Sequence, residues 1–159
     1  MDITQEEINR LIEVIKIEEN DEEIIFTCEN KKQYILNSEE NKNEKFRLVF
    51  TVNRNPKKKT ICILHNNFML RRIDINGRHK NPDTPTGIPM IDKYQGQWIE
   101  ETHIHISLDI LEKEDAWAVP LHEVFTETSI EKILDFFSKI TNIKEGIKYK
   151  PEIQNLKLF

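Results

Sequence analysis

Five strand-like runs between residues 24 and 75 constrain the fold of this chain more than any other feature. In residues 45–53 every second position is apolar, which is the period that places one face of a β-strand on a core. Short polar turns separate the runs, and the first two are close enough to form a hairpin across residues 29–31. The pattern predicts an antiparallel meander with strands at residues 24–28, 33–36, 46–52, 60–64 and 68–75.

An amphipathic helix is predicted before the meander. Thr4 and Glu7 have the Thr-x-x-Glu spacing of a capping box, in which each side chain binds a backbone N–H of the first turn. Apolar residues follow at helical spacing as far as Ile15, and the polar pair at residues 20–21 marks the expected end of the helix. The outer face of this helix carries Glu6, Arg10 and Glu13.

A second amphipathic helix is predicted near the other end of the chain. Thr128 begins another capping-box pattern, and the apolar stripe that follows it ends near Asn142. Two shorter strands are predicted before this helix, at residues 102–108 and 115–119. Residues 156–159 are apolar enough for a short final strand.

These elements together predict a single domain of the α+β class that spans residues 1–159. The architecture is a curved antiparallel sheet of about six to seven strands, with the N-terminal and C-terminal amphipathic helices packed on one of its faces. A chain of 159 residues fits one domain. A hydrophobic content of 38% against 32% charged residues predicts a core of modest size.

The charge balance argues against nucleic acid as the main partner. The chain has 28 acidic and 23 basic residues and a net charge of −5, whereas phosphate-binding proteins carry a basic excess and DNA mimics are far more acidic. No apolar run reaches the length of a membrane span, and the acidic start of the chain is unlike a signal peptide. We expect a soluble protein of a reducing compartment, in which Cys28 and Cys62 are free buried thiols.

Polar residues gather in and after a long loop at residues 76–101. In the strand that follows, His103 and His105 share the face opposite the isoleucines. Two histidines at this spacing suit a metal that takes a third ligand from Asp74, His79 or Asp83. The alternative is a structural role, with the imidazoles bonded to backbone carbonyls beneath the loop, and we expect neither a metal nor another cofactor.

The same residue types suit a small metal-independent ribonuclease or a toxin-like enzyme. Such an enzyme needs a histidine as acid or base and an arginine or lysine that stabilises the phosphorane. The candidate catalytic residues are Arg72, His79, Asp83, His103 and His105. The competing structural interpretation pairs Arg71 or Arg72 with Asp74 or Asp109 and places residues 81–83 in a turn with an Asx hydrogen bond.

Three other features are candidate partner-binding surfaces. They are the charged outer face of the first helix, a basic turn and the aromatic residues of the long loop, represented by Glu6, Arg10, Glu13, Lys57, Lys58, Lys59, Tyr94 and Trp98. Tryptophan and tyrosine dominate the energetics of many protein interfaces. The apolar loop residues can instead fasten the loop to the core, which is the role that we expect, and Trp117 is expected in the core.

One pattern resembles a family of small uncharacterised proteins from bacteria and their mobile elements. It reads Arg72-x-Asp74-x-x-Gly77-x-His79-x-Asn81-Pro82-Asp83, then His103-x-His105, then Trp117-Ala118-x-Pro120-Leu121. The whole chain also resembles the type II-A anti-CRISPR proteins, which are phage-encoded inhibitors of Cas9. That likeness lies in its length, its acidic capped first helix and its composition rich in Lys, Asn and Ile.

The resemblance to anti-CRISPR proteins implies a stoichiometric binder of Cas9 and not an enzyme. Such a binder acts in the cytoplasm of the host bacterium, without direct contact with nucleic acid or membrane. We expect it to hold the HNH nuclease domain and to block the movement that licenses cleavage, while loading of target DNA is spared. The ribonuclease or toxin-like enzyme is the alternative.

Overall fold

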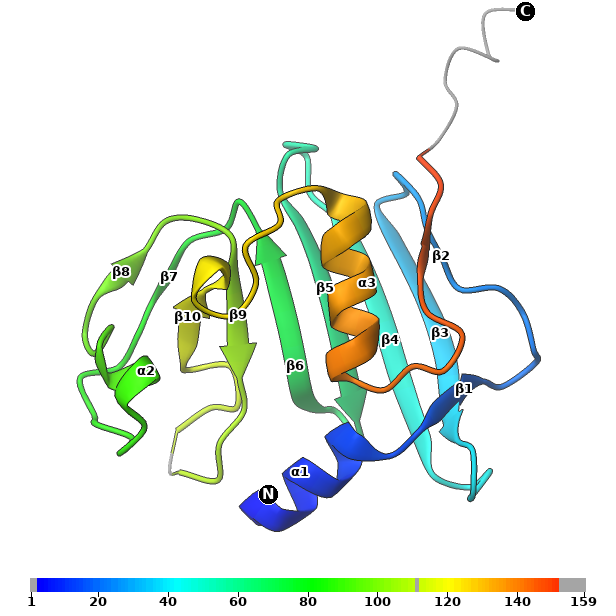
Figure 1. Ribbon diagram of the computed structural model, residues 1–159, viewed down its shortest axis with the longest axis horizontal. Helices are drawn as coiled ribbons and strands as arrows, with labels where there is room; N and C mark the ends of the chain where they lie inside the picture. Colours follow the sequence, from blue (N-terminus) through cyan, green and yellow to red (C-terminus); the bar gives the residue numbers. More distant parts are fainter. Residues whose placement is uncertain (1–2, 111, 152–159) are drawn as a thin grey trace, which may run out of the picture.

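Seven antiparallel strands form the central sheet of the computed structural model, which describes residues 3–110 and 112–151 (Figure 1). The spatial order is β1-β3-β4-β5-β6-β9-β10, so the sheet is open and ends in two edge strands. The bounds are β1 Lys16–Glu18, β3 Lys31–Ser38, β4 Lys45–Val52, β5 Lys59–His65, β6 Phe68–Ile75, β9 His103–Ile106 and β10 Ala118–Pro120. Most of the predicted meander and the α+β class are therefore confirmed.

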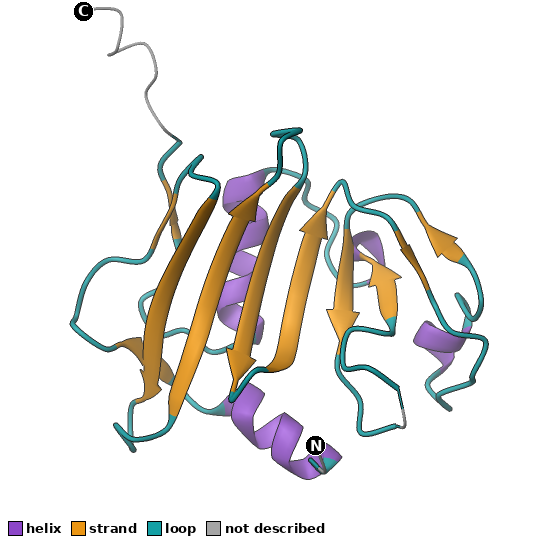
Figure 2. Cartoon of the chain, turned by 180° about the vertical axis from the view of Figure 1, so that it is seen from behind, coloured by secondary structure: helices purple, strands orange, loops and turns teal. Residues whose placement is uncertain are grey.

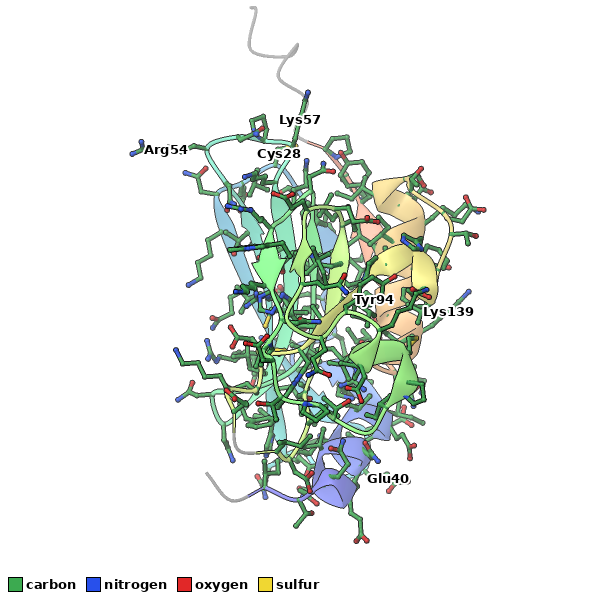
Figure 3. All side chains as sticks on the ribbon, turned by 90° about the vertical axis from the view of Figure 1, so that its left-hand side faces the viewer. Cys28, Glu40, Arg54, Lys57, Tyr94 and Lys139 are labelled. Atoms are coloured by element: carbon green, nitrogen blue, oxygen red, sulfur yellow. The ribbon has the colours of Figure 1, made fainter. Side chains whose placement is uncertain are left out.

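Two helices cover one face of the sheet. α1 (Gln5–Glu13) and α3 (Ile130–Ile140) lie on the same side in Figure 1, and the view from behind shows β3–β6 without a helix over them (Figure 2). Leu48 and Ile63 are paired in register and fully buried, as is Phe137 of α3. The core therefore lies between the sheet and the two helices, a layering that Figure 3 shows from the side.

α1 begins as predicted but ends earlier. The Thr4 Oγ1 accepts a hydrogen bond from the Glu7 N–H at 3.1 Å. The Glu7 carboxylate accepts from the Arg10 guanidinium instead of completing the capping box. Val14 is extended, and the chain enters β1 at Lys16 instead of continuing as a helix to residue 20. The prediction assumed that Lys16 lies on the solvent face of the helix, but its side chain is fully buried in the structure.

The predicted first hairpin is wrong. β2 (Ile25–Phe26) pairs in parallel with β11 (Lys148–Tyr149) in a separate two-stranded sheet, and β1 occupies the edge of β3. The Phe26 side chain is fully buried, and its ring centroid lies 4.9 Å from that of Phe50. β2 thereby gains core contacts that it would lack as the edge strand of a hairpin.

The C-terminal helix matches its prediction except at its cap. Ser129, and not Thr128, is the N-cap of α3, because its Oγ accepts a hydrogen bond from the Lys132 N–H. The helix ends at Ile140, close to the predicted end. The strand predicted at 115–119 is β10, which begins only at Ala118. Residues 156–159, where a last strand was predicted, lie outside the described residues.

The long loop is folded into short elements beside β10. It contains β7 (His79–Lys80), α2 (Pro89–Asp92) and β8 (Trp98–Ile99), and η1 (Leu121–Glu123) follows β10 (Figure 1). β7 and β8 pair as a two-stranded sheet, and α2 contacts β10. Ile91 and Ile99 are buried, so apolar side chains fasten the loop to the rest of the molecule.

Cys28 and Cys62 are free thiols, as predicted, although both are only half-buried. Burial raises the pKa of Cys62 to about 12, so that thiol stays protonated and unreactive at neutral pH. Within the described part of the chain, no helix combines the length and the apolar character that crossing a bilayer requires.

Candidate functional site

Two neighbouring strands bring four polar side chains together on the sheet face opposite the helices. β6 pairs with β9 so that Asp74 lies opposite His103 and Arg72 lies opposite His105. The isoleucines between them are buried in the core on the other face, as the alternation along a strand requires. β7 adds a fifth side chain, and we call these five residues the histidine–aspartate cluster: Arg72, Asp74, His79, His103 and His105.

Three atoms at the centre of the cluster form a compact triangle. The Nε2 atoms of His103 and His105 are 3.1 Å apart, and the Oδ2 atom of Asp74 lies 3.4 Å from each of them. Both imidazoles are fully buried, and the Asp74 side chain is 14% exposed. Asp74 is therefore the member of the triangle that reaches the surface.

Backbone carbonyls determine which nitrogens of the two buried histidines carry hydrogen. The Nδ1 of His103 lies 2.7 Å from the Glu101 carbonyl oxygen, and the Nδ1 of His105 lies 2.8 Å from that of Asp115. A carbonyl oxygen only accepts hydrogen bonds, so each Nδ1 donates. In the neutral rings, each Nε2 therefore presents a lone pair to the centre of the triangle.

Arg72 supplies the positive charge of the cluster. Its Nε donates to the Oδ1 of Asp74 at 2.7 Å, and its Nη2 lies 3.0 Å from the Nε2 of His105. Burial acts to raise the pKa of Asp74, but the neighbouring imidazoles of His103 and His105 and the charge of Arg72 outweigh burial and lower the pKa. Asp74 is therefore a carboxylate at neutral pH.

His79 places a third imidazole over the other two. Its Nε2 donates to the Ala116 carbonyl at 2.6 Å, and its ring centroid lies 4.6 Å from that of His105 in an edge-to-face contact. Burial lowers the pKa of His79, although the bond to the Ala116 carbonyl opposes this. Burial also lowers the pKa of His105, against the effect of Asp74. Both rings are therefore neutral near pH 7.

Gly77 and Asn81 hold the loop against the cluster. A side chain at Gly77 would place its Cβ 2.9 Å from the Cβ of Asp74 and 3.1 Å from the Cε1 of His103. The Asn81 amide accepts from the Ala118 N–H at 2.9 Å and donates to the Ala118 carbonyl at 2.8 Å. Gly77 and Asn81 both belong to the sequence pattern, and these contacts show that each has a structural role beside the cluster.

Two cavities flank the cluster, and basic residues line both. A cavity of about 250 Å³ is lined by Asp74 together with Lys58, Lys59 and Arg78. A cavity of about 450 Å³ is lined by His79 and Asp115 together with Lys80, Asp83, Glu112 and Lys113. The first cavity combines one carboxylate with three cations, although the protein as a whole is acidic.

Four of the five candidate catalytic residues meet in the cluster. The fifth, Asp83, is exposed, and its carboxylate packs against Gly96. Asp74, one of the three residues named as a possible third metal ligand, lies beside the histidines instead. Asp115, whose Oδ2 lies 3.6 Å from the Nη1 of Arg72, was not predicted, because only the tertiary fold brings it to the cluster.

The candidate partner-binding residues do not form one surface. Glu6, Arg10 and Glu13 lie on α1, whereas Lys57–Lys59 lie at the turn between β4 and β5, at the opposite end of the sheet. Figure 3 shows Lys57 at one end of the molecule, and Figure 1 places α1 at the other. Arg10 is also engaged, since it pairs with two glutamates, Glu7 and Glu44.

Of the two aromatic residues proposed to bind a partner or to fasten the loop to the core, one is packed and one is exposed. The hydroxyl of Tyr94 donates to Glu123, and its ring packs against the core, as expected of a residue that fastens the loop. Trp98 does not fasten the loop in this way. The residue is 53% exposed, and the Arg78 guanidinium carbon lies 4.0 Å from its ring centroid. Trp117 is buried as predicted.

The fold and the site define a small α+β protein that carries a buried histidine–aspartate cluster on the sheet face away from its helices. The chain belongs to a family of unknown function, DUF6978, whose model matches residues 3–143. That span includes every residue of the cluster and both helices. Neither the curated proteins nor the solved structures provide a match to the chain.

Proposed function

We propose that the protein is a small ribonuclease-like enzyme whose site is the histidine–aspartate cluster. The observation that carries the proposal is the convergence of three imidazoles, one carboxylate and one guanidinium from β6, β7 and β9. Titratable groups with shifted pKa values that gather beside a cavity are typical of catalytic sites. This observation favours the enzyme over the binder that the resemblance to anti-CRISPR proteins implies.

His79 is the imidazole that a substrate can reach. It lines the larger cavity, whereas the other two imidazoles are fully buried. Because its Nε2 donates to the Ala116 carbonyl, its Nδ1 keeps a free lone pair. A neutral histidine with a lowered pKa can accept a proton at pH 7, so His79 is the proposed general base.

The charges of the smaller cavity support an anionic substrate. Lys58, Lys59 and Arg78 line it beside Asp74, whereas the larger cavity carries two lysines and three carboxylates. Arg72 can stabilise negative charge that develops on a phosphate. RNA is favoured over DNA because its 2′-hydroxyl is an internal nucleophile that a histidine base can activate.

The test is cleavage of single-stranded RNA by the purified protein at pH 7, with product ends analysed for 2′,3′-cyclic phosphates. We expect multiple turnovers, and His79→Gln should lower the rate at least about 100-fold. His122→Gln is the matched control, because His122 is exposed and contacts Glu101 outside the cluster. Absence of cleavage at protein excess, or equal rates for wild type and His79→Gln, contradicts the proposal.

A second candidate function is inhibition of Cas9 by binding, in the cytoplasm of the host bacterium. The exposed indole of Trp98, stacked on Arg78, favours it, since tryptophan and arginine are enriched at interface hot spots. In this proposal the protein holds the HNH domain and blocks its activating movement, while target DNA still loads. Direct contact with nucleic acid is not part of this function.

Titration into a guide-loaded Cas9 cleavage reaction tests the second candidate. We expect inhibition that saturates near one protein per Cas9, persists in His79→Ala/His103→Ala/His105→Ala and is lost in Trp98→Ala. Cas9 should still bind target DNA in the presence of the protein. No inhibition at large excess excludes the second candidate, and loss of DNA binding excludes the HNH mechanism.

A further inference from the structure

The triangle at the centre of the cluster has the dimensions of a metal-ligand set. Its sides are 3.1, 3.4 and 3.4 Å. Two ligand atoms that bind one ion at about 2.1 Å, with an angle of about 95–110° between them, are about 3.1–3.4 Å apart. We propose that Asp74, His103 and His105 bind one divalent transition-metal ion of the zinc type.

The hydrogen bonds of the two histidines support this assignment. Both Nδ1 atoms are used by carbonyls of the chain, which fixes the ring orientations and leaves the Nε2 lone pairs of His103 and His105 facing one point. Histidines that bind metals commonly donate their second nitrogen to a carbonyl or carboxylate in this way. A cation at that point replaces the repulsion between these two lone pairs and the Asp74 carboxylate by three favourable contacts.

Asp74 is oriented for the same role. Arg72 holds both oxygens of Asp74, Oδ1 at 2.7 Å through Nε and Oδ2 at 3.1 Å through Nη2, and Oδ2 is the oxygen that lies 3.4 Å from both imidazoles. The same Nη2 lies 3.0 Å from the Nε2 of His105, and that contact must give way when an ion binds because Nε2 has a single lone pair. Oδ2 has a second lone pair, so it can bind the ion and keep its hydrogen bond from Nη2. Asp115 lies 3.6 Å from the Nη1 of the same guanidinium and offers it an alternative partner.

The donor set selects the class of ion. Two imidazole nitrogens and one carboxylate suit zinc, cobalt and related ions, whereas magnesium and calcium prefer oxygen ligands. Three protein ligands leave a position for a water molecule or a phosphate oxygen. Asp74 borders the smaller cavity, so this position is accessible to a small ligand. The inference deepens the ribonuclease-like proposal, and its catalytic meaning rests on that proposal.

The experiment is a calorimetric titration of the full chain with ZnCl₂ after chelator treatment and removal of the chelator. We expect one ion per chain, with an affinity at least about tenfold weaker in Asp74→Asn and His103→Gln. His122→Gln should bind as wild type, since that histidine lies outside the cluster. Stoichiometric binding that is equal in all four proteins, or no binding by wild type, overturns the proposal.

Cobalt provides a second measurement that needs no variant. Co²⁺ bound by two imidazoles and a carboxylate should give stronger visible absorption than Co²⁺ in buffer, and Zn²⁺ should abolish that absorption by displacement. A spectrum identical to that of Co²⁺ in buffer overturns the proposal even if the variants fail to fold. Neither measurement contains RNA, so failure to bind metal and failure to cleave RNA are distinguishable.

Discussion

Lys16 joins the C-terminal ends of two helices. Its ammonium donates to the carbonyls of Ile12 and Val14 at the end of α1 and to that of Thr141, the C-cap of α3, at 2.7–2.9 Å. The side chain is fully buried, and its Nζ also lies 4.9 Å from the centre of the Phe46 ring. Helix C-termini leave carbonyls unpaired, and a lysine satisfies three of them here.

The titration of Lys16 predicts a pH-dependent stability. Burial lowers its pKa from 10.5 to about 7, although Glu44 opposes this. The folded state then binds fewer protons than the unfolded state between pH 7 and 10.5, so stability rises with pH in that window. Relative to Lys16→Met, the free energy of unfolding of the wild type, measured by urea denaturation, should rise by about 2 kcal/mol between pH 7 and pH 9. A constant difference would show that the carbonyl bonds keep the pKa near its usual value.

Gly77 tests how tightly the loop lies on the cluster. Gly77→Ala places a methyl group against Asp74 and His103, and overpacking of this kind costs about 1–3 kcal/mol. Urea denaturation should show this loss, and the NMR signals of the His103 imidazole should move.

The matched control for this prediction is Gly87→Ala. Gly87 has a φ of +83° but nothing within 4 Å of an added Cβ, so the cost should come from backbone strain alone, about 1 kcal/mol. The His103 signals should stay in place in this control. Equal movement in both variants would contradict the contact between Gly77 and the cluster.

At the scale of elements, Asn81 acts as a partner for the edge strand β10. It supplies both a donor and an acceptor to Ala118, which is the pairing that another strand would provide. Asn81→Ala should lower stability by about 2 kcal/mol, because two buried backbone groups lose their partners. Amide hydrogen exchange at Ala118 should become faster.

Asn9→Ala provides the comparison, since Asn9 is exposed on α1 and its change should alter stability by less than about 0.5 kcal/mol. Protection of the Ala118 amide that is unchanged in Asn81→Ala would show that β10 does not depend on this side chain.

The central strands were predictable because local alternation and short turns specify them. β4, β5 and β6 follow one another in sequence and pair in that order. β1 and the pairing of β2 were not predictable, because β1 depends on the burial of a lysine and the partner of β2 is distant in sequence. Lys16 is a charged residue in the core, and β2 pairs with residues 148–149. Propensity and period carry no information about such contacts.

The cluster was partly predictable for the same reason. His103 and His105 share a strand face by period two, and β6 pairs with β9 to bring Arg72 and Asp74 beside them. Asp83 was chosen because it follows Asn81 in the sequence pattern, but the turn aims its carboxylate at Gly96. Proximity in sequence therefore failed where the chain leaves regular structure, whereas the period of two along a strand correctly placed His103 and His105 on one face.

At the scale of the molecule, the area of the surface limits what one partner can cover. A standard interface buries about 800 Å² on each side, which is less than a tenth of the 9428 Å² that this protein exposes. One partner domain of that size is therefore not expected to cover both α1 and the Lys57–Lys59 turn, which lie at opposite ends of the sheet (Figure 1).

This geometry gives a prediction for the Cas9 titration. Of two charge-reversal variants, Lys57→Glu/Lys58→Glu/Lys59→Glu and Glu6→Lys/Glu13→Lys, at most one should weaken inhibition, because each alters a different end of the molecule. The measurement is the protein concentration that halves Cas9 cleavage, with circular dichroism as the check on folding. Loss of inhibition in both folded variants would require a partner surface larger than the standard size.

The pairing of early with late segments has a consequence for biosynthesis. The Lys16 N–H donates to the Asn142 carbonyl, and the Lys144 N–H donates to the Lys16 carbonyl. β2 likewise cannot pair until β11 has been synthesised. A ribosome adds about 5–20 residues per second, so about 6–25 s separate the synthesis of Phe26 from that of its strand partner. During that interval the nascent chain exposes a phenylalanine that the finished molecule buries completely, which makes it a substrate for chaperones that act at the ribosome.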